Sequence, residues 1–367
     1  MKTAKEIFYD LKRKKIILMS VLILLIFFAF VLSLCFGAVS VAIPDVLRAI
    51  GHALLPDLIS PTDRVSELII MRIRLPRALM TIVTGISLGV AGTVMQGTLR
   101  NPLVSPFTLG LSSAAAFGAS LMIVVGPAMF GSLAAMSVVF MDSAFSSASV
   151  LRVLSAFGMG LVSMGLVLVM TRIKRMTNST MILAGVVLSY LFQAGIMFLK
   201  YISSNSELRD VTMWMMGGFG SITWATFILV TPIVSVCTVM LMRQSMRYNA
   251  LSCGDDVARN LGVNVNSLKR TSLLIVAVSV SACMAFTGVI GFIGLMAPHM
   301  CRMIIGNDHK YLIPCSAMMG AFILLLSDLV GRVVAAPEEL PVGVIMYILG
   351  GIFFIYLICK GRGRGID

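Results

Sequence analysis

The sequence predicts an all-α polytopic membrane protein with about ten transmembrane helices. Of its 367 residues, 58% are hydrophobic and only 12% are charged, whereas soluble domains carry about 25% charged residues. Uncharged apolar stretches recur along the chain, and several reach the ~20 residues that a helix needs to cross a 30 Å hydrocarbon layer. Basic residues gather at the ends of these stretches, which is typical of loops beside membrane spans.

The first apolar stretch, residues 16–36, holds 21 positions without a charge. A secretory signal peptide has an apolar core of about 7–15 residues and then a cleavage site of small residues. Because this stretch is longer, we expect a retained first span that follows a cytoplasmic N-terminal segment, residues 1–15.

Nine further apolar stretches follow the first along the chain. They are 78–99, 107–125, 153–170, 181–199, 225–242, 271–290, 294–305, 312–327 and 342–359. The stretch 294–305 is short for crossing a bilayer by itself. We expect residues 16–360 to form one transmembrane domain, followed by a cytoplasmic tail at 361–367.

The basic residues predict which side of the membrane each loop occupies. If residues 12–15 lie in the cytoplasm, the basic loops around 100, 172–175, 243–270 and 360–364 also lie there, as the positive-inside pattern requires. Both chain ends are then cytoplasmic, in a multi-pass protein of the cell membrane. The net charge of +13 is explained by this orientation and does not indicate a nucleic-acid partner. Four arginines fall on the outer side and need another explanation: Arg72, Arg74, Arg77 and Arg332.

The sequence offers little for catalysis or ion coupling. All 16 Asp and Glu residues lie in predicted loops or at span ends, and the three His residues are far apart. An ion-driven carrier usually keeps a carboxylate inside the membrane, and an ATPase of the P-loop type needs a GxxxxGK[ST] motif that the chain lacks. We therefore expect no enzyme activity, metal or cofactor in this chain. An ion-coupled carrier that acts alone remains the alternative.

The loop 254–270, GDDVARNLGVNVNSLKR, predicts two short helices on the cytoplasmic side. Asp255 or Asp256 can cap the first helix, and Gly262 is a typical stop just after its end. Asn264 or Asn266 can cap the second helix. An apolar edge on the first helix would be formed by Val257, Ala258 and Leu261. Such a knob suits a groove in another protein, although an ordinary solvated linker remains open.

Four sequence blocks resemble the FecCD-type permeases, which are membrane subunits of ATP-binding-cassette importers for iron chelates, haem and cobalamin. The motifs are RLPR at 74–77, QGTLRNPL at 96–103, GFIGLMAPH at 291–299 and PEELPVG at 337–343. Further similarity lies in ILAGVVLSYLF at 182–192 and VARNLGVNVNSLKR at 257–270. The resemblance covers nearly all of the chain after Arg74.

The resemblance implies the type II importer fold and a homodimer of permease subunits around a central pathway. Two ATPase subunits would bind ATP and Mg²⁺ beneath the dimer, and an extracytoplasmic substrate-binding protein would dock on top. The remaining partner is membrane lipid. Which substrate is carried stays open, because relatives handle siderophores, haem, cobalamin and oxyanions.

The same resemblance assigns two contact surfaces. Contact with the ATPase is implied for Asp255, Asp256, Val257, Ala258, Leu261, Gly262 and Val263. Docking of the substrate-binding protein is implied for Arg74, Arg77 and Arg332. The alternatives for these arginines are placement at the membrane interface or, for Arg332, an ion pair with Asp328 within the chain.

A cytoplasmic gate is implied where the second span ends. Pro102 disfavours a helical backbone at Asn101, so the chain must turn there, and Pro106 restarts it. The resemblance places this turn and the turn before span five in the gate, through Asn101, Leu103, Asn178 and Ser179. The alternative is a helix-breaking loop without a gating role.

Span five is expected to line the transport pathway. Its polar and large side chains recur at i, i+1, i+4 and i+8, which lie near one stripe of a helix. The residues of this stripe are Ser189, Tyr190, Gln193 and Met197.

Overall fold

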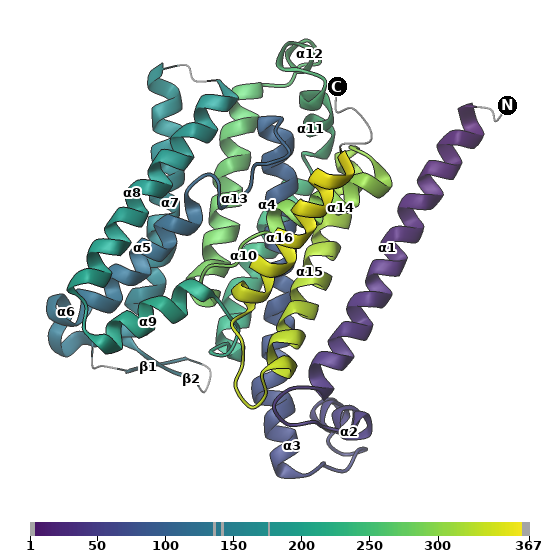
Figure 1. The fold of residues 1–367 in the computed structure, drawn as a ribbon. Coiled ribbons are helices and arrows are strands. Elements are labelled where there is room, and N and C mark those ends of the chain that lie inside the picture. Colours follow the sequence, from purple (N-terminus) through teal and green to yellow (C-terminus); the bar gives the residue numbers. More distant parts are fainter. Residues whose placement is uncertain (1–3, 135–136, 141–142, 175–176, 362–367) are drawn as a thin grey trace.

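The computed structural model describes residues 4–134, 137–140, 143–174 and 177–361, and within them the fold is helical apart from one short hairpin (Figure 1). Eight helical segments are long and apolar enough to cross a membrane, and two shorter apolar helices accompany them. In chain order the apolar helices are α1 (Ala4–Cys35), α4 (Leu75–Leu99), α5 (Leu111–Val124), α7 (Ser147–Lys174), α8 (Asn178–Ile202), α10 (Trp224–Met242), α13 (Val265–Thr287), α14 (Ile293–Ile305), α15 (His309–Val334) and α16 (Val342–Gly361). The predicted all-α membrane fold is confirmed.

The connecting elements gather at the two ends of the bundle (Figure 1). One end carries α2 (Ile43–Leu54), α3 (Arg64–Leu68), the π-helical turn η1 (Ile69–Arg74), α6 (Gly126–Ala134), α9 (Asn205–Met216) and a two-stranded antiparallel hairpin, β1 (Ser137–Phe140) and β2 (Ser143–Ser146). The hairpin pairs Ser137 with Ser146 and Phe140 with Ser143. The opposite end carries α11 (Ser245–Ser252) and α12 (Asp255–Asn260), together with the start of α1 and the end of α16.

Helix α4 lies at the centre of the packed core. It contacts α15, α13, α14 and α10, and most of its apolar span is buried. A side chain at Gly89 would overlap the carbonyl oxygen of Ser316 in α15, and one at Gly92 would overlap that of Gly294 in α14. These glycines therefore let three helices approach at backbone distance, as small residues do in membrane bundles.

The outer helices expose their apolar side chains. Helices α1, α8 and α16 are mostly unburied along their apolar windows, and residues such as Phe27, Leu191 and Ile355 are more than half exposed. Apolar surface on this scale is unfavourable in water and is typical of contact with lipid or with a second membrane chain.

The predicted span 107–125 begins later than expected. Residues 101–110 are not helical, and α5 starts at Leu111 after Gly110, whose φ is +83°. The turn before it is held by Ser105 and Thr108, where the Thr108 hydroxyl accepts a hydrogen bond from Ser105 N at 2.9 Å and donates one to Ser105 O. The sequence predicted one apolar helix shorter than a full span, at 294–305. The structure has two such helices, α5 and α14.

Candidate functional site

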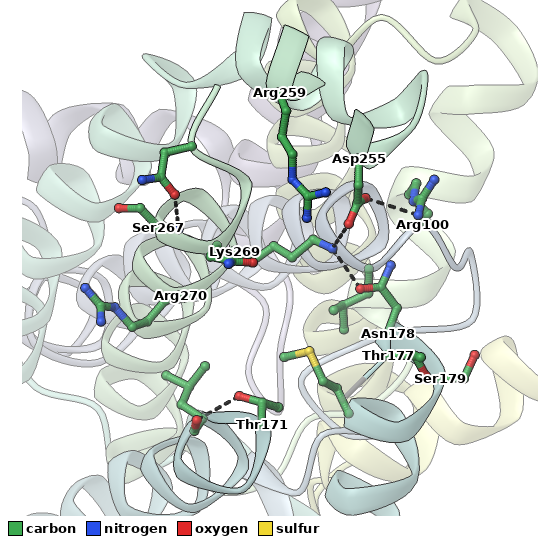
Figure 2. Close-up of a pocket in the computed structure, with 15 residues that line it drawn as sticks. Arg100, Thr171, Thr177, Asn178, Ser179, Asp255, Arg259, Ser267, Lys269 and Arg270 are labelled. Atoms are coloured by element: carbon green, nitrogen blue, oxygen red, sulfur yellow. Dashed lines mark hydrogen bonds and ion pairs between the residues drawn. The ribbon is translucent and has the colours of Figure 1, made fainter. Parts of the chain in front are cut away.

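A cleft of about 1310 Å³ opens at the end of the bundle that carries α12 (Figure 2). Its walls come from the turn after α4, the end of α7, the first turn of α8, α12 and the start of α13. Asn178 and Ser179, predicted for the gate, line it together with Asp255, predicted for ATPase contact. The structure thus brings two of the predicted groups to one place.

The first helix of the loop 254–270 begins without the predicted cap. Gly254 occupies the N-cap position with φ +122°, and no side chain caps the helix. The prediction that Asp255 or Asp256 caps α12 is wrong, because both carboxylates bind cations instead. Asp256 pairs with Arg259 at 3.0 Å on the exposed surface, whereas Asp255 turns into the cleft.

The end of α12 and the start of α13 form as predicted. Gly262 has φ +80°, Val263 N donates to Ala258 O, and Gly262 N donates to Arg259 O, both at 2.9 Å. This pair of bonds is a Schellman motif, which favours glycine at the left-handed position. The Asn264 side chain then accepts from Ser267 N at 3.0 Å and caps α13.

The apolar edge of α12 is narrower than predicted. Val257 is 45% exposed and Leu261 is 67% exposed, whereas Ala258 is fully buried. Ala258 was therefore wrongly assigned to the exposed edge, because it faces the neighbouring helices and packs in the main core. Val257 and Leu261 form the knob, and Val263 behind them is half-buried.

Asp255 joins three segments of the chain through ionic contacts (Figure 2). Its Oδ1 lies 3.1 Å from Nη2 of Arg100, the residue that ends α4, and its Oδ2 accepts from Nζ of Lys269 in α13 at 2.8 Å. Lys269 Nζ also donates to Oδ1 of Asn178, the first residue of α8, at 2.9 Å. Partial burial opposes ionisation of Asp255, but the hydrogen bond and charge of Lys269, aided by Arg100, outweigh it and lower its pKa.

Sequence reasoning missed Arg100 and Lys269 as members of this site. Both were assigned only to the basic pattern that orients the membrane spans. A useful signal was present, because Arg100 directly precedes the predicted gate turn and Lys269 belongs to the loop predicted to dock. Nothing in the sequence gives their convergence on one carboxylate, which depends on how α4, α8 and α13 pack.

The other predicted gate residues lie at the same turn as Arg100. The Asn101 side chain accepts a hydrogen bond from Leu103 N at 2.9 Å, which fixes the turn, and Leu103 is 62% exposed. Neither residue lines the cleft.

The predicted pathway stripe on α8 faces mainly outward. Tyr190 is 74% exposed and Met197 is 64% exposed, while Gln193 and Ser189 are half-buried. Ser189 donates its hydroxyl back to Gly185 O at 2.9 Å. None of these four residues lines the cleft, so a pathway along them needs a second surface opposite α8.

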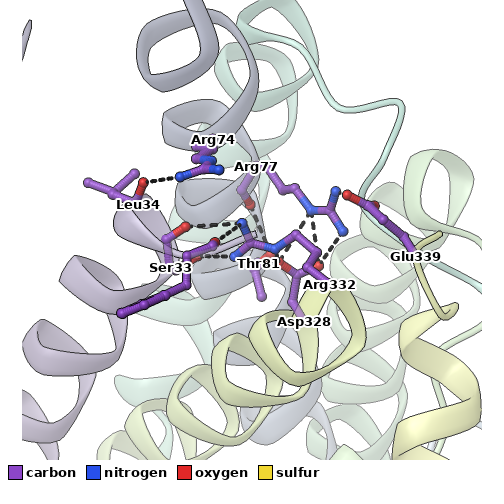
Figure 3. Close-up of polar contacts among 9 residues, drawn as sticks. Ser33, Leu34, Arg74, Arg77, Thr81, Asp328, Arg332 and Glu339 are labelled. Carbon is purple, nitrogen blue, oxygen red and sulfur yellow. Dashed lines mark hydrogen bonds and ion pairs between the residues drawn. The ribbon is translucent and has the colours of Figure 1, made fainter. Parts of the chain in front are cut away.

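The arginines at the end of the bundle that carries α2 and α3 are buried within the chain rather than presented to solvent (Figure 3). Arg74, Arg77 and Arg332 are 5%, 6% and 3% exposed. The exposed side chains that direct docking of a substrate-binding protein would need are therefore not found at these three positions. A charge removed from water must be paired or hydrogen-bonded, and carboxylate or carbonyl groups of this chain contact all three guanidinium groups.

Asp328 of α15 lies at the centre of this buried cluster. It accepts from Nε and Nη2 of Arg77 at 3.0 and 2.8 Å and pairs with Nε of Arg332 at 3.1 Å. Arg77 also pairs with Glu339 at 2.7 Å. The alternative of an intrachain Arg332–Asp328 pair is confirmed, and Asp328 lies inside α15 rather than at the end of a span.

Arg74 and Arg332 also bind the backbone at the end of α1. Arg74 donates to Leu34 O and Cys35 O at 2.7 and 2.8 Å, and to Val39 O. Arg332 donates to Ser33 O at 3.0 Å. Carbonyl groups at the end of a helix lack helical partners, so these arginines fix the end of α1 against α4 and α15.

A smaller cavity of about 400 Å³ lies beside this cluster. Its lining includes Arg77 and Glu339, together with Arg152, Asp210 and Trp214. Sequence reasoning did not single out Arg152 or Asp210, which lie far apart in the chain.

Comparison with known proteins gives one consistent result. The family model described as the FecCD transport family matches residues 24–360. The hemin transport system permease protein HmuU of Yersinia pestis is 37% identical over 80% of this chain and 83% of its own length. The vitamin B12 import system permease protein BtuC of Serratia proteamaculans is 35% identical over the same shares of the two chains.

A solved structure of a metal-chelate type ABC transporter in an inward-facing conformation shares the fold. The TM-score is 0.78 at 30% sequence identity, and the match covers 93% of this chain and 98% of the other.

Proposed function

Because this chain belongs to the FecCD transport family, we propose that it is the permease subunit of an ATP-binding-cassette importer for an iron chelate, haem or cobalamin. The observation that supports this most directly is the match of the whole fold to a metal-chelate transporter. The relatives named for hemin and vitamin B12 transport support haem or cobalamin as the cargo of this chain. An extracytoplasmic binding protein would deliver that cargo.

Energy would enter through the knob formed by Val257 and Leu261. A partner that carries the ATP site would receive these two exposed side chains in a groove, because burial of exposed apolar side chains is favourable. Two ATPase subunits, one for each permease copy, would hydrolyse ATP with Mg²⁺, and this chain itself would bind neither.

The cargo pathway would form between two copies of the chain. The exposed stripe of α8, with Tyr190 and Met197, would face its symmetry mate across the pathway, since a two-fold assembly presents the same surface from both subunits. Asn101, Leu103, Asn178 and Ser179 would close this pathway at the end that carries α12. ATP binding would then shift the population between outward-open and inward-open states.

The outer end would receive the substrate-binding protein. Arg74, Arg77 and Arg332 would act there as a scaffold beneath the docking surface, because they fix α1, α4 and α15 relative to one another. The α12 end and both chain ends would lie in the cytoplasm, in agreement with the basic residues at that end.

Reconstitution tests the proposal against an ion-coupled carrier. The chain is placed in liposomes with its ATPase and binding protein, and uptake of haem, cobalamin and a ferric siderophore is measured. We expect uptake of one of them that requires ATP and both partners. Uptake driven by a proton or sodium gradient without the ATPase would contradict the proposal and support the carrier.

A further inference from the structure

We propose that Arg100, Asp255, Lys269 and Asn178 form a latch that ties the ATPase-contacting helix α12 to the turns at the end of α4 and the start of α8. Asp255 and Lys269 would be positioning residues, which hold the gate turns and release them when α12 moves. This inference rests on the proposed function for the source of that movement. The latch itself is defined by contacts within this chain.

Each contact of the latch joins a different pair of segments. Asp255 connects α12 to the end of α4 through Arg100, at 3.1 Å, and to α13 through Lys269, at 2.8 Å. Lys269 connects α13 to the start of α8 through Asn178, at 2.9 Å. Lys269 Nζ donates to both Asp255 and Asn178. A displacement of α12 therefore weakens the contacts that hold the turn after α4 and the turn before α8.

The backbone at Arg100 is a second, independent observation. Arg100 closes α4 with φ +49° and ψ +42°, which is the left-handed region. Only two residues other than glycine have a positive φ in the part of the chain that the structure describes. Glycine or asparagine is favoured at such a helix end. An arginine in this backbone conformation therefore indicates that its side chain has a role there, which we assign to the contact with Asp255.

Asp255 also opposes repulsion among the cations of the cleft. Among the lining residues that the structure describes, four are basic, Arg100, Arg259, Lys269 and Arg270, and one is acidic, Asp255. Neutralising Asp255 would leave these four cations without an acidic counter-charge in the lining, and like charges favour separation of their segments. Asp255 stays ionised at neutral pH, because Lys269 lowers its pKa despite partial burial.

The exposure of a buried reporter tests the latch without any ATPase. Met181 lines the cleft in the first turn of α8 and is 6% exposed. Met181→Cys is introduced in the full chain after Ser replaces the exposed Cys253 and Cys359, and maleimide labelling is timed in liposomes. We expect Asp255→Asn to raise the labelling rate about fivefold, because local opening limits access to a buried group.

Asp256→Asn is the matched control. It neutralises the adjacent carboxylate, which is 92% exposed and pairs with Arg259 on its own helix. This variant should label at the unmodified rate. Equal labelling rates in the Asp255→Asn and control chains would overturn the latch, whatever the ATPase does.

The assembled transporter tests what the latch does. We expect Asp255→Asn to lower the amount of cargo moved per ATP hydrolysed about fivefold, since breaking one ionic contact changes a two-state balance by roughly this factor. Arg100→Gly should also lower the cargo moved per ATP, although glycine adopts the left-handed backbone at this position with less strain. Lys269→Gln combined with Asp255→Asn should add little, because both belong to one network.

The outcomes separate the latch from the proposed function. Faster labelling with no ATP-dependent uptake by the unmodified chain would support the latch and refute the importer. Loss of ATPase binding in Asp255→Asn would make Asp255 a direct contact and overturn its positioning role. A normal transport ratio in Arg100→Gly would remove Arg100 from the latch.

Discussion

At the scale of single residues, Asp328 stands out because it forms ion pairs with two arginines, Arg77 and Arg332. The Asp328 side chain is fully buried, and both arginines are almost fully buried. A buried ion pair contributes little compared with an apolar replacement, but removal of one partner leaves an uncompensated charge and costs about 3–5 kcal/mol. We therefore regard this cluster as a point where one substitution affects α1, α4 and α15 together.

We predict that Asp328→Asn lowers the free energy of unfolding by about 3–5 kcal/mol, because it leaves Arg77 and Arg332 short of negative charge. The measurement is thermal unfolding in detergent, compared with the exposed Glu338→Gln as a control. Equal stability of the two variants would show that carbonyl groups and Glu339 satisfy both arginines.

The arginines also show where sequence reasoning ends at this scale. Their place at the end of the bundle opposite α12 followed from the span count, whereas their burial did not. Arg77 is 251 residues from Asp328 in the chain, and nothing local predicts that contact. The one local pair, Arg332 with Asp328 at i,i+4, was open to sequence reasoning and is confirmed.

At the scale of elements, helix contacts depend on glycine. We predict that Gly89→Ala costs about 1–3 kcal/mol, the usual penalty for overpacking, because the new methyl group would overlap the Ser316 carbonyl group of α15. Gly165→Ala on α7 meets open space and should be neutral or mildly stabilising, since alanine favours helix. Thermal unfolding of both variants checks this, and equal losses would contradict the close α4–α15 contact.

The knob on α12 allows a second test at this scale. We predict that Leu261→Asp weakens ATPase binding by about 2 kcal/mol or more, as expected for a central apolar contact. Asn260→Asp adds the same charge to the neighbouring exposed position and should bind nearly normally. Binding is measured by titrating purified ATPase onto the permease, and equal affinities would indicate that Leu261 is not covered in the complex.

Local motifs were more predictable than the caps and starts that depend on tertiary contacts. Gly262 and Asn264 act as predicted, because a Schellman turn and an Asn cap need only adjacent residues. The Asp255 cap was wrong, since Arg100 and Lys269 compete for that carboxylate. The start of α5 was misplaced because Ser105 and Thr108 hold a turn that apolar composition does not reveal.

At the scale of the whole molecule, the charge pattern and the fold make the same division into two ends. The start of α1, the end of α16 and α12 lie at one end of the bundle, while α2, α3 and the β1–β2 hairpin lie at the opposite end (Figure 1). Composition and apolar length predicted this architecture well, because both follow from the thickness of the bilayer. The cleft could not be predicted in this way, because it depends on how distant segments pack.

The division predicts which side of the membrane each exposed cysteine reaches. The exposed Cys253 lies just before α12, and Leu58, between α2 and α3, is 80% exposed at the opposite end. In intact cells, a membrane-impermeant maleimide should therefore label Leu58→Cys but not Cys253, because basic loops are retained in the cytoplasm. Permeabilised cells should label both, which controls for reactivity. Labelling of Cys253 from outside would invert the chain and place the knob out of reach of any ATP-consuming partner.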